Sequence, residues 1–276
     1  MTRYGFIGTG SMGSMLVRRV IASAGVAPDA IAASSKTMVS ARALAEKTGI
    51  TAVPSNCAVA ERADLLFICV KPLVVRSVLA EIHDAIRPGT VLVSIAGCVS
   101  LEQLEEWAGD GIRCVRVIPS VTAEQDAGIS LVAWGDRVRP EDKTLVLGLL
   151  NQISRAVECD EKDFDLCTDL TSCGPALIVS MVQEFSRAAA RTGTIPPEMA
   201  DFLARETLIG TARILAAEKM TFDEVIARVA TKGGTTEEGV KVLRAEMPAV
   251  MAGMLRSMDA KRQLTSEKVA TEKSPG

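Results

Sequence analysis

Two glycine-rich turns, each followed by a helical pattern, are the segments of this sequence best suited to chemistry. The first, Gly8-Thr9-Gly10-Ser11-Met12-Gly13, lies between an apolar strand pattern and a helical one. Glycines at this spacing let the backbone turn tightly, and the helix that follows points its N–H groups and positive dipole end at a diphosphate. The motif alone is weak, but its place between a strand and a helix makes it specific. We predict a dinucleotide site that contains Gly8, Gly10, Ser11, Met12 and Gly13.

The end of the second predicted strand indicates which dinucleotide binds. In domains of this type an acidic side chain there accepts hydrogen bonds from a free ribose 2′-hydroxyl and repels a 2′-phosphate. Here the sequence is Ser34-Ser35-Lys36, with hydroxyls and an ammonium but no carboxylate. These groups favour a phosphate, so we predict NADP over NAD, which stays possible. The alternative is that Ser35 only caps the next helix while Lys36 is solvated.

Two further loops should face the cofactor, because ligands of this fold bind at the carboxyl ends of parallel strands. Val70-Lys71-Pro72 follows the fourth predicted strand, and Ala96-Gly97 follows the fifth. Gly97 would let the backbone approach the nicotinamide closely. Lys71 could instead be an ordinary solvated loop lysine.

The second glycine-rich turn, Gly233-Gly234-Thr235-Thr236, opens a helical pattern and forms a candidate anion site. The alternative is a capped helix after a glycine turn, with no ligand. Lys232, just before it, could add a cation for a carboxylate or could point to water. No metal site is expected, because the seven cysteines contain no C-x-x-C pair and the single histidine, His83, lies on a helical pattern.

The elements that must position these residues alternate along the first 160 residues, which predicts an α/β fold with a Rossmann-type parallel sheet covered by helices on both faces. Expected strands are Arg3 to Ile7, Ile31 to Ala33, Ile50 to Val53, Leu65 to Val70, Val91 to Ile95, Arg113 to Val117, Ile129 to Ala133 and Ala156 to Cys159. Expected helices between them are Ser14 to Ala24, Met38 to Lys47, Val74 to Ala85, Leu101 to Trp107 and Pro140 to Asn151.

After Asp160 only helical patterns remain, so residues 161–264 should form an all-α domain for substrate binding and dimerisation. Its expected helices are Asp163 to Ser172, Pro175 to Thr192, Pro197 to Glu218, Phe222 to Val229 and Thr235 to Met258. The Pro197 to Glu218 pattern is apolar or small on much of its circumference, which indicates burial against a second subunit. The polar residues 265–276 are expected to be a disordered tail.

Composition excludes several function classes. The net charge is −3, and Lys and Arg are spread along the chain, so nucleic acid is not an expected partner. No apolar run is long enough for a membrane helix, and no signal peptide pattern is present, so we expect a cytoplasmic protein. Without a suitable histidine, catalysis by a histidine general base is not expected.

Taken in order, several motifs resemble the pyrroline-5-carboxylate reductase family from about residue 3 to about residue 260. They are the Gly8 to Gly13 fingerprint, Asn56, Val70-Lys71-Pro72, Arg116-Val117-Ile118-Pro119, Gly174-Pro175-Ala176 and Gly233-Gly234-Thr235-Thr236 with Gly239. The resemblance implies hydride transfer from NAD(P)H to C5 of a cyclic imine that carries a carboxylate. It implies that Asn56 belongs to the cofactor site. It also implies dimers whose interleaved helices complete the active site.

Within the second turn, the resemblance implies that Thr236 faces the ring nitrogen of the substrate. Gly233, Gly234 and Thr235 would bind its carboxylate, with Thr231 and Lys232 beside them. A hydroxyl would suffice because a cyclic imine is basic enough to be partly protonated near neutral pH.

The sequence departs from the family near the expected substrate. The family usually has Ser-Pro where this chain has Thr231-Lys232, and Met-Pro-Asn-Thr-Pro where it has Ile118-Pro119-Ser120-Val121-Thr122. The family's Ser-Gly-Ser-Gly-Pro-Ala-Tyr is here Thr171-Ser172-Cys173-Gly174-Pro175-Ala176-Leu177. Three functions therefore stay open: reduction of 1-pyrroline-5-carboxylate, reduction of a different imine or carbonyl, and NADP binding in a regulatory protein without turnover.

Overall fold

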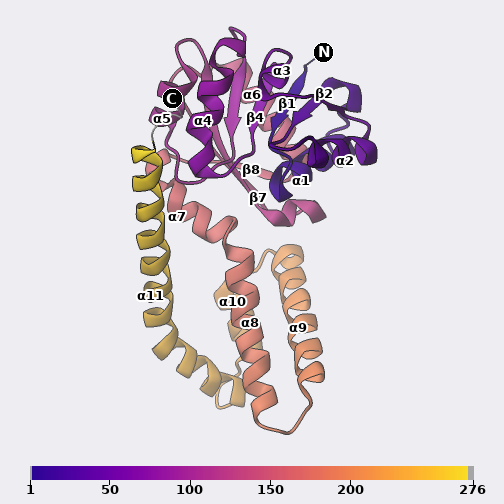
Figure 1. Cartoon of the computed structure of the whole chain (residues 1–276). Helices are drawn as coiled ribbons and strands as arrows, with labels where there is room; N and C mark the ends of the chain where they lie inside the picture. The colour runs from indigo at the N-terminus through magenta and orange to yellow at the C-terminus, as the bar shows by residue number, and fades with distance from the viewer. Residues whose placement is uncertain (1, 273–276) are drawn as a thin grey trace. The chain divides into compact units, whose positions relative to one another are not determined.

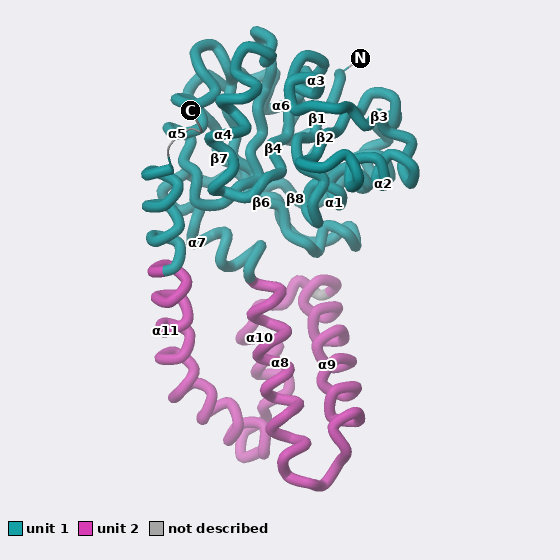
Figure 2. Tube along the Cα trace, in the orientation of Figure 1, with its two compact units in different colours: residues 1–173, 261–276 teal, residues 174–260 magenta. Residues whose placement is uncertain are grey.

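The computed structural model describes residues 2–272 and divides into two compact units. Unit 1 comprises residues 1–173 together with 261–276, and unit 2 comprises residues 174–260 (Figure 2). The expected boundary at residue 160 differs from this division. The first helix after it contributes Phe164 to the core of unit 1, and so belongs with the sheet.

Unit 1 is built on a sheet with helices around it (Figure 1). The sheet has eight strands in the order β3-β2-β1-β4-β5-β6-β7-β8. The strands are β1 (Tyr4–Ile7), β2 (Ile31–Ser34), β3 (Thr51–Ala52), β4 (Leu65–Ile68), β5 (Val91–Ser94), β6 (Arg113–Pro119), β7 (Ile129–Trp134) and β8 (Arg155–Glu158). All eight lie within the ranges predicted from the sequence or within two residues of them. The Rossmann-type α/β class is thus confirmed.

One pairing differs from the fully parallel sheet that we predicted. β7 runs antiparallel to β6, with Val117 opposite Val132. The connection between them holds only the short 3-10 helix η3 (Val121–Gln125). A parallel return needs a crossover of a dozen or more residues, so this short connection forces the chain to reverse direction.

Helices cover both faces of the sheet, as expected. They are α1 (Ser11–Ala22), α2 (Met38–Thr48), α3 (Asn56–Ala60), α4 (Pro72–Ile82), α5 (Leu101–Ala108), α6 (Pro140–Ile153) and α7 (Glu161–Thr171), with the 3-10 helices η1 (Pro28–Ala30) and η2 (His83–Ala85). One core cluster joins α1, α2 and α6, and the other joins α3, α4, α5 and α7. Successive residues of the strands alternate between them, as the pleat requires: Phe6 enters the first cluster and Ile7 the second.

Unit 2 is helical, as the sequence predicts. Its helices are α8 (Gly174–Arg191), α9 (Pro197–Glu218), α10 (Phe222–Val229) and the first part of α11 (Thr235–Thr271). The bounds of α9 and α10 match the predicted ranges, because a proline opens the first and a Thr221 capping box opens the second.

The predicted end of the last helix is wrong. α11 continues to Thr271 instead of stopping near Met258, so residues 265–271 are helical and not a disordered tail. Val269 of this segment is buried in the core of unit 1, which explains why a polar sequence is ordered there. Residues 273–276 of the predicted tail lie outside the described residues.

Within unit 2, α9 packs along α8 but leaves large apolar side chains exposed. Phe202 and Leu203 of α9 and Phe185 of α8 are about half exposed or more, whereas Ala200 and Ala204 are buried. Exposed aromatic and aliphatic side chains at this density indicate a surface that another protein chain covers.

The carboxyl of Asp64, just before β4, links Arg3, just before β1, to Arg87, just before β5. It accepts hydrogen bonds from the Arg3 backbone N–H and side chain and from Arg87 Nη2. Burial by itself would raise the pKa of this carboxyl, but the bonds from Arg3 and Arg87 lower it to about 2. Because the pKa of this carboxyl is lower in the folded protein than in the unfolded chain, the ionised carboxyl stabilises the fold above about pH 4. This stabilisation is lost as the pH falls through about 2.

We therefore expect Asp64→Asn to reduce the free energy of unfolding near neutral pH by about 1 kcal/mol, since solvent partly screens these ion pairs. Near pH 2 the difference between the variant and the parent should be smaller, because the parent carboxyl is then about half protonated. Urea titrations at both pH values measure the difference. Asp110→Asn, which removes a fully exposed carboxylate paired with Arg137, is the control and should change nothing. An equal loss for Asp64→Asn at both pH values would contradict the ionic role.

Candidate active site

The glycine fingerprint has the geometry of a phosphate-binding turn. Gly8 has φ +100°, and a Cβ there would lie 2.5 Å from the carbonyl oxygen of Cys69. A Cβ on Gly13 would lie 2.1 Å from the carbonyl oxygen of Gly8, whereas one on Gly10 would meet nothing within 4 Å. Gly8 and Gly13 are thus required by the close packing of β1, β4 and α1, and Gly10 leaves open space on the side where a ligand would lie.

The N-terminus of α1 is equipped to bind an anion. Its N-cap residue is Gly10, which offers no side-chain oxygen, and its first turn contains no acidic residue. Ser11 and Met12 form the start of this turn, and Ser14 Oγ turns away from it to donate to the Thr9 carbonyl. The N–H groups of the first turn therefore receive no side-chain cap, which is the arrangement that a diphosphate needs.

Beside the fingerprint, unit 1 contains a cavity of about 570 Å³. It brings together five of the residues predicted to bind the cofactor: Gly8, Ser35, Lys36, Asn56 and Val70. Its other lining residues are Ile7, Pro54, Ser55, Val74, Ser77, Val78 and Glu81. The cavity has the size of a nucleotide-binding cleft and combines an apolar wall with a polar end.

Hydrogen bonds organise the polar end of this cavity. The buried Ser34 hydroxyl donates to Asn56 Oδ1 at 2.7 Å, and Asn56 Nδ2 donates to Glu81 Oε2 at 2.7 Å. Ser35 Oγ donates to the Thr37 carbonyl and accepts from Ala41 N–H near the start of α2, whose N-cap residue is Thr37. Ser35 therefore contacts the helix start and also lines the cavity.

The α4 face of the cavity was not predicted from the sequence. Val74, Ser77, Val78 and Glu81 line it together. Their spacing of three and four residues was the signal that could have identified them, because such residues share one side of a helix. Its use required knowing that α4 lies beside the end of β2.

Of the two other predicted cofactor loops, Val70 lines this cavity, and the other four residues do not. Lys71 is the N-cap residue of α4, with an exposed side chain, and Pro72 is the first residue of that helix. Ala96 is buried, whereas Gly97 has open space where a Cβ would be, and the left-handed backbone (φ 62°) falls on Cys98 instead. A cofactor role for these four residues stays a prediction.

The second glycine-rich turn lies at the start of α11 in unit 2. Gly233 has φ +76°, and Gly234 N–H donates to the Thr231 carbonyl at 2.9 Å. Lys232, Thr235 and Thr236 are exposed. The turn and the helix N-terminus that we predicted are present, and the roles of these residues toward a substrate stay predictions.

A residue of this turn that the sequence reasoning missed is Glu237. Its Oε2 accepts a hydrogen bond from Gly233 N–H at 2.7 Å, so a carboxylate already occupies one donor of the candidate anion site. A glutamate two residues after the start of a helical pattern is a common capping signal, which could have identified it. A substrate carboxylate that used this N–H would have to displace it.

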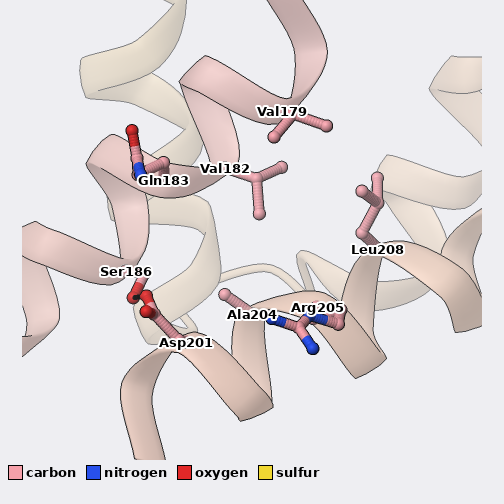
Figure 3. Close-up of a pocket in the computed structure, with 8 residues that line it drawn as sticks. All are labelled: Val179, Val182, Gln183, Ser186, Asp201, Ala204, Arg205 and Leu208. Carbon is pink, nitrogen blue, oxygen red and sulfur yellow. Dashed lines mark hydrogen bonds between the residues drawn. The ribbon is translucent and has the colours of Figure 1, made fainter. Parts of the chain in front are cut away.

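Unit 2 contains a second cavity, between α8 and α9 (Figure 3). Its polar corner is the hydrogen bond from Ser186 Oγ to Asp201 Oδ1, near Gln183 and Arg205. Val179, Val182 and Leu208 form its apolar side (Figure 3). This bond joins the two helices of the pair, and Ser186 is 4% exposed.

Other kinds of site receive no support from the part of the chain that the structure describes. Among residues 2–272 no group of His, Cys, Asp and Glu side chains could hold a metal ion. Within the same residues no helix is long and apolar enough to cross a bilayer. All seven cysteines are free thiols.

Comparison with protein families and solved structures is consistent with this geometry. Residues 161–264 match the family model for pyrroline-5-carboxylate reductase dimerisation, and residues 3–97 match that for NADP oxidoreductase coenzyme F420-dependent. The fold is similar to that of a pyrroline-5-carboxylate reductase from Coxiella burnetii, with a TM-score of 0.85, 24% identity and coverage of 100% of this chain and 99% of that one. The fold is also similar to that of a Plasmodium falciparum pyrroline carboxylate reductase crystallised with NADP. The TM-score is 0.82 at 22% identity, with coverage of 97% of this chain and 98% of that one.

Among curated proteins, ComE operon protein 4 of Bacillus subtilis is 31% identical over 244 residues, which cover 88% of this chain and 89% of that protein. Pyrroline-5-carboxylate reductase 3 of Bacillus subtilis is 34% identical over 276 residues, covering 99% of this chain and 100% of that protein. The similarity thus extends through both units and includes both glycine-rich turns. This chain belongs to the pyrroline-5-carboxylate reductase family of oxidoreductases.

Proposed function

We propose that this protein is an NADPH-dependent reductase that transfers a hydride to the imine carbon of 1-pyrroline-5-carboxylate and so produces proline. The observation that carries the proposal is the Gly233-Gly234-Thr235-Thr236 turn at the N-terminus of α11, in a chain that aligns with pyrroline-5-carboxylate reductases over nearly its whole length. When bound, the reduced nicotinamide would supply the hydride.

The cofactor fits the residues of unit 1. The N–H groups at the start of α1 would bind the diphosphate, and Gly10 leaves room for it. Val70, Val74 and Val78 offer an apolar wall for the adenine, and Lys36 offers a cation for a 2′-phosphate.

The residues of the second turn would hold the substrate. The N-terminus of α11, with Thr235 and Lys232, would bind the carboxylate, and the Thr236 hydroxyl would donate a hydrogen bond to or accept one from the ring nitrogen. The imine takes its proton from solvent, the hydride adds to the imine carbon, and the proton stays on the nitrogen of the resulting amine. The reaction therefore balances without an acidic side chain, and positioning supplies much of the rate.

We also propose that the protein acts as a homodimer or larger homo-oligomer through unit 2, and that it works in the cytoplasm. The dimerisation family model and the exposed apolar side chains of α8 and α9 support the first part. Seven free cysteines are typical of a reducing compartment and support the second.

Oxidation of NADPH, followed at about 340 nm with 1-pyrroline-5-carboxylate, tests the proposed reaction. Complementation of a proline auxotroph tests the same reaction in cells. Turnover with another cyclic imine but not with this one would favour a different substrate, for which the substituted Thr231-Lys232 leaves room. Tight NADPH binding without turnover would favour a regulatory role, a second candidate because Thr231-Lys232 and other residues expected near the substrate depart from the family pattern.

Lys36→Glu tests the proposed phosphate contact. Lys36 is exposed and lines the cavity, so reversing its charge should weaken NADPH binding at least about tenfold more than NADH binding. Dissociation constants from the fluorescence of the bound reduced nicotinamide measure both. Lys47→Glu, on the last turn of α2, the helix that follows Lys36, is the control and should affect the two cofactors equally. Equal losses for Lys36→Glu would refute the contact.

A further inference from the structure

A carboxylate lines the cofactor cavity together with the residues expected to bind a phosphate. Glu81, on the last turn of α4, shares the cavity lining with Ser35 and Lys36. The end of β2 carries no acidic residue, so the sequence alone indicates a site without negative charge. The fold supplies that charge from a different element.

Glu81 is held in place by a chain of hydrogen bonds. Asn56 Nδ2 donates to Glu81 Oε2 at 2.7 Å, and Asn56 Oδ1 accepts from the buried Ser34 hydroxyl at 2.7 Å. The opposite amide orientation would set Oδ1 against the carboxylate, so the chain fixes Asn56 as well as Glu81. The thiol of Cys57 donates to the Glu81 carbonyl oxygen at 3.3 Å, which joins α4 to the first turn of α3.

The charges of the cavity cancel. Of its lining residues, Lys36 is the cation and Glu81 the anion. A ribose 2′-phosphate would be attracted by Lys36 and repelled by Glu81, whereas a free 2′-hydroxyl could donate a hydrogen bond to the carboxylate. A site with Lys36 alone would select NADPH more strongly than this site does.

We propose that Glu81 determines cofactor specificity by opposing the 2′-phosphate of NADP, and that it thereby keeps NADH usable as a second cofactor. Glu81 supplies from α4 the carboxylate that β2 lacks. The inference rests on the proposed function only in that a nicotinamide dinucleotide occupies this cavity. It does not depend on which imine is reduced.

The test uses fragments that differ by the phosphate alone. Calorimetric titration of the full-length protein with 2′,5′-ADP and with 5′-AMP gives the ratio of their affinities without any turnover. Glu81→Gln keeps an acceptor for Asn56 and removes the charge, so the ratio should rise about fivefold in favour of 2′,5′-ADP. Raising the salt concentration from about 50 mM to about 500 mM should shrink that rise.

Glu106→Gln, on the exposed side of α5, removes the same charge outside the cavity and is the matched control; its ratio should equal that of the parent. An unchanged or lower ratio in Glu81→Gln would overturn the role of Glu81 and leave the proposed reaction intact. A rise of the same size in both variants would also overturn it, because it would reflect net charge alone. Failure of the parent to bind either nucleotide would overturn both proposals.

Discussion

Thr236→Val is expected to lower kcat/KM for 1-pyrroline-5-carboxylate about a hundredfold while NADPH binds as in the parent. Valine keeps the shape of threonine and removes the hydroxyl, which in the proposed function bonds the ring nitrogen. The loss should occur in kcat as well as KM, because the bond strengthens as the nitrogen becomes an amine. Initial rates of NADPH oxidation, with a separate titration of NADPH, measure both effects.

Two further variants separate the hydroxyl from the backbone turn. Thr236→Ser restores a hydroxyl and should recover most of the activity. Thr271→Val, at the other end of α11, removes a hydroxyl that bonds the Glu267 carbonyl and should leave the rates unchanged. Full activity in Thr236→Val would refute the assigned role and would point to the helix N-terminus alone.

Arg262→Met should reduce the free energy of unfolding by about 3 kcal/mol. Arg262 Nη2 donates to Asp169 Oδ1, and the Asp169 side chain is 4% exposed. Removing the arginine leaves a buried carboxylate without its cation, and breaking such a pair costs far more than the pair contributed. Asp165, a further acidic neighbour, lies 3.8 Å from Arg262 Nε and is half exposed, so it should contribute little.

Urea unfolding followed by circular dichroism measures this loss. Asp169→Asn added to Arg262→Met should recover part of it, because the unpaired charge is gone. Lys268→Met, an exposed residue of the same segment of α11, should unfold like the parent. A loss below about 1 kcal/mol for Arg262→Met would show that the pair is weak, as pairs at the surface are.

Local signals predicted most of the fold because they act over a few residues. The bounds of α9 and α10 follow from Pro197 and from the Thr221 capping box, each within one helical turn of the helix that it starts. The five-residue helix α3 was missed, since so short a segment shows no periodicity.

The sequence by itself determined the glycine fingerprint, the phosphate-binding start of α1 and the threonine turn of α11, since each is a contiguous segment whose chemistry is local. Only the tertiary structure decided which side chains from distant segments contact one another. Glu81 joins Ser34 and Asn56 because the fold brings the end of β2, the start of α3 and the last turn of α4 within hydrogen-bonding distance of one another. The end of α11 is helical because Val269 packs in the core of unit 1 and Arg262 pairs with Asp169. These partners lie far away in the chain, so no local pattern reveals them.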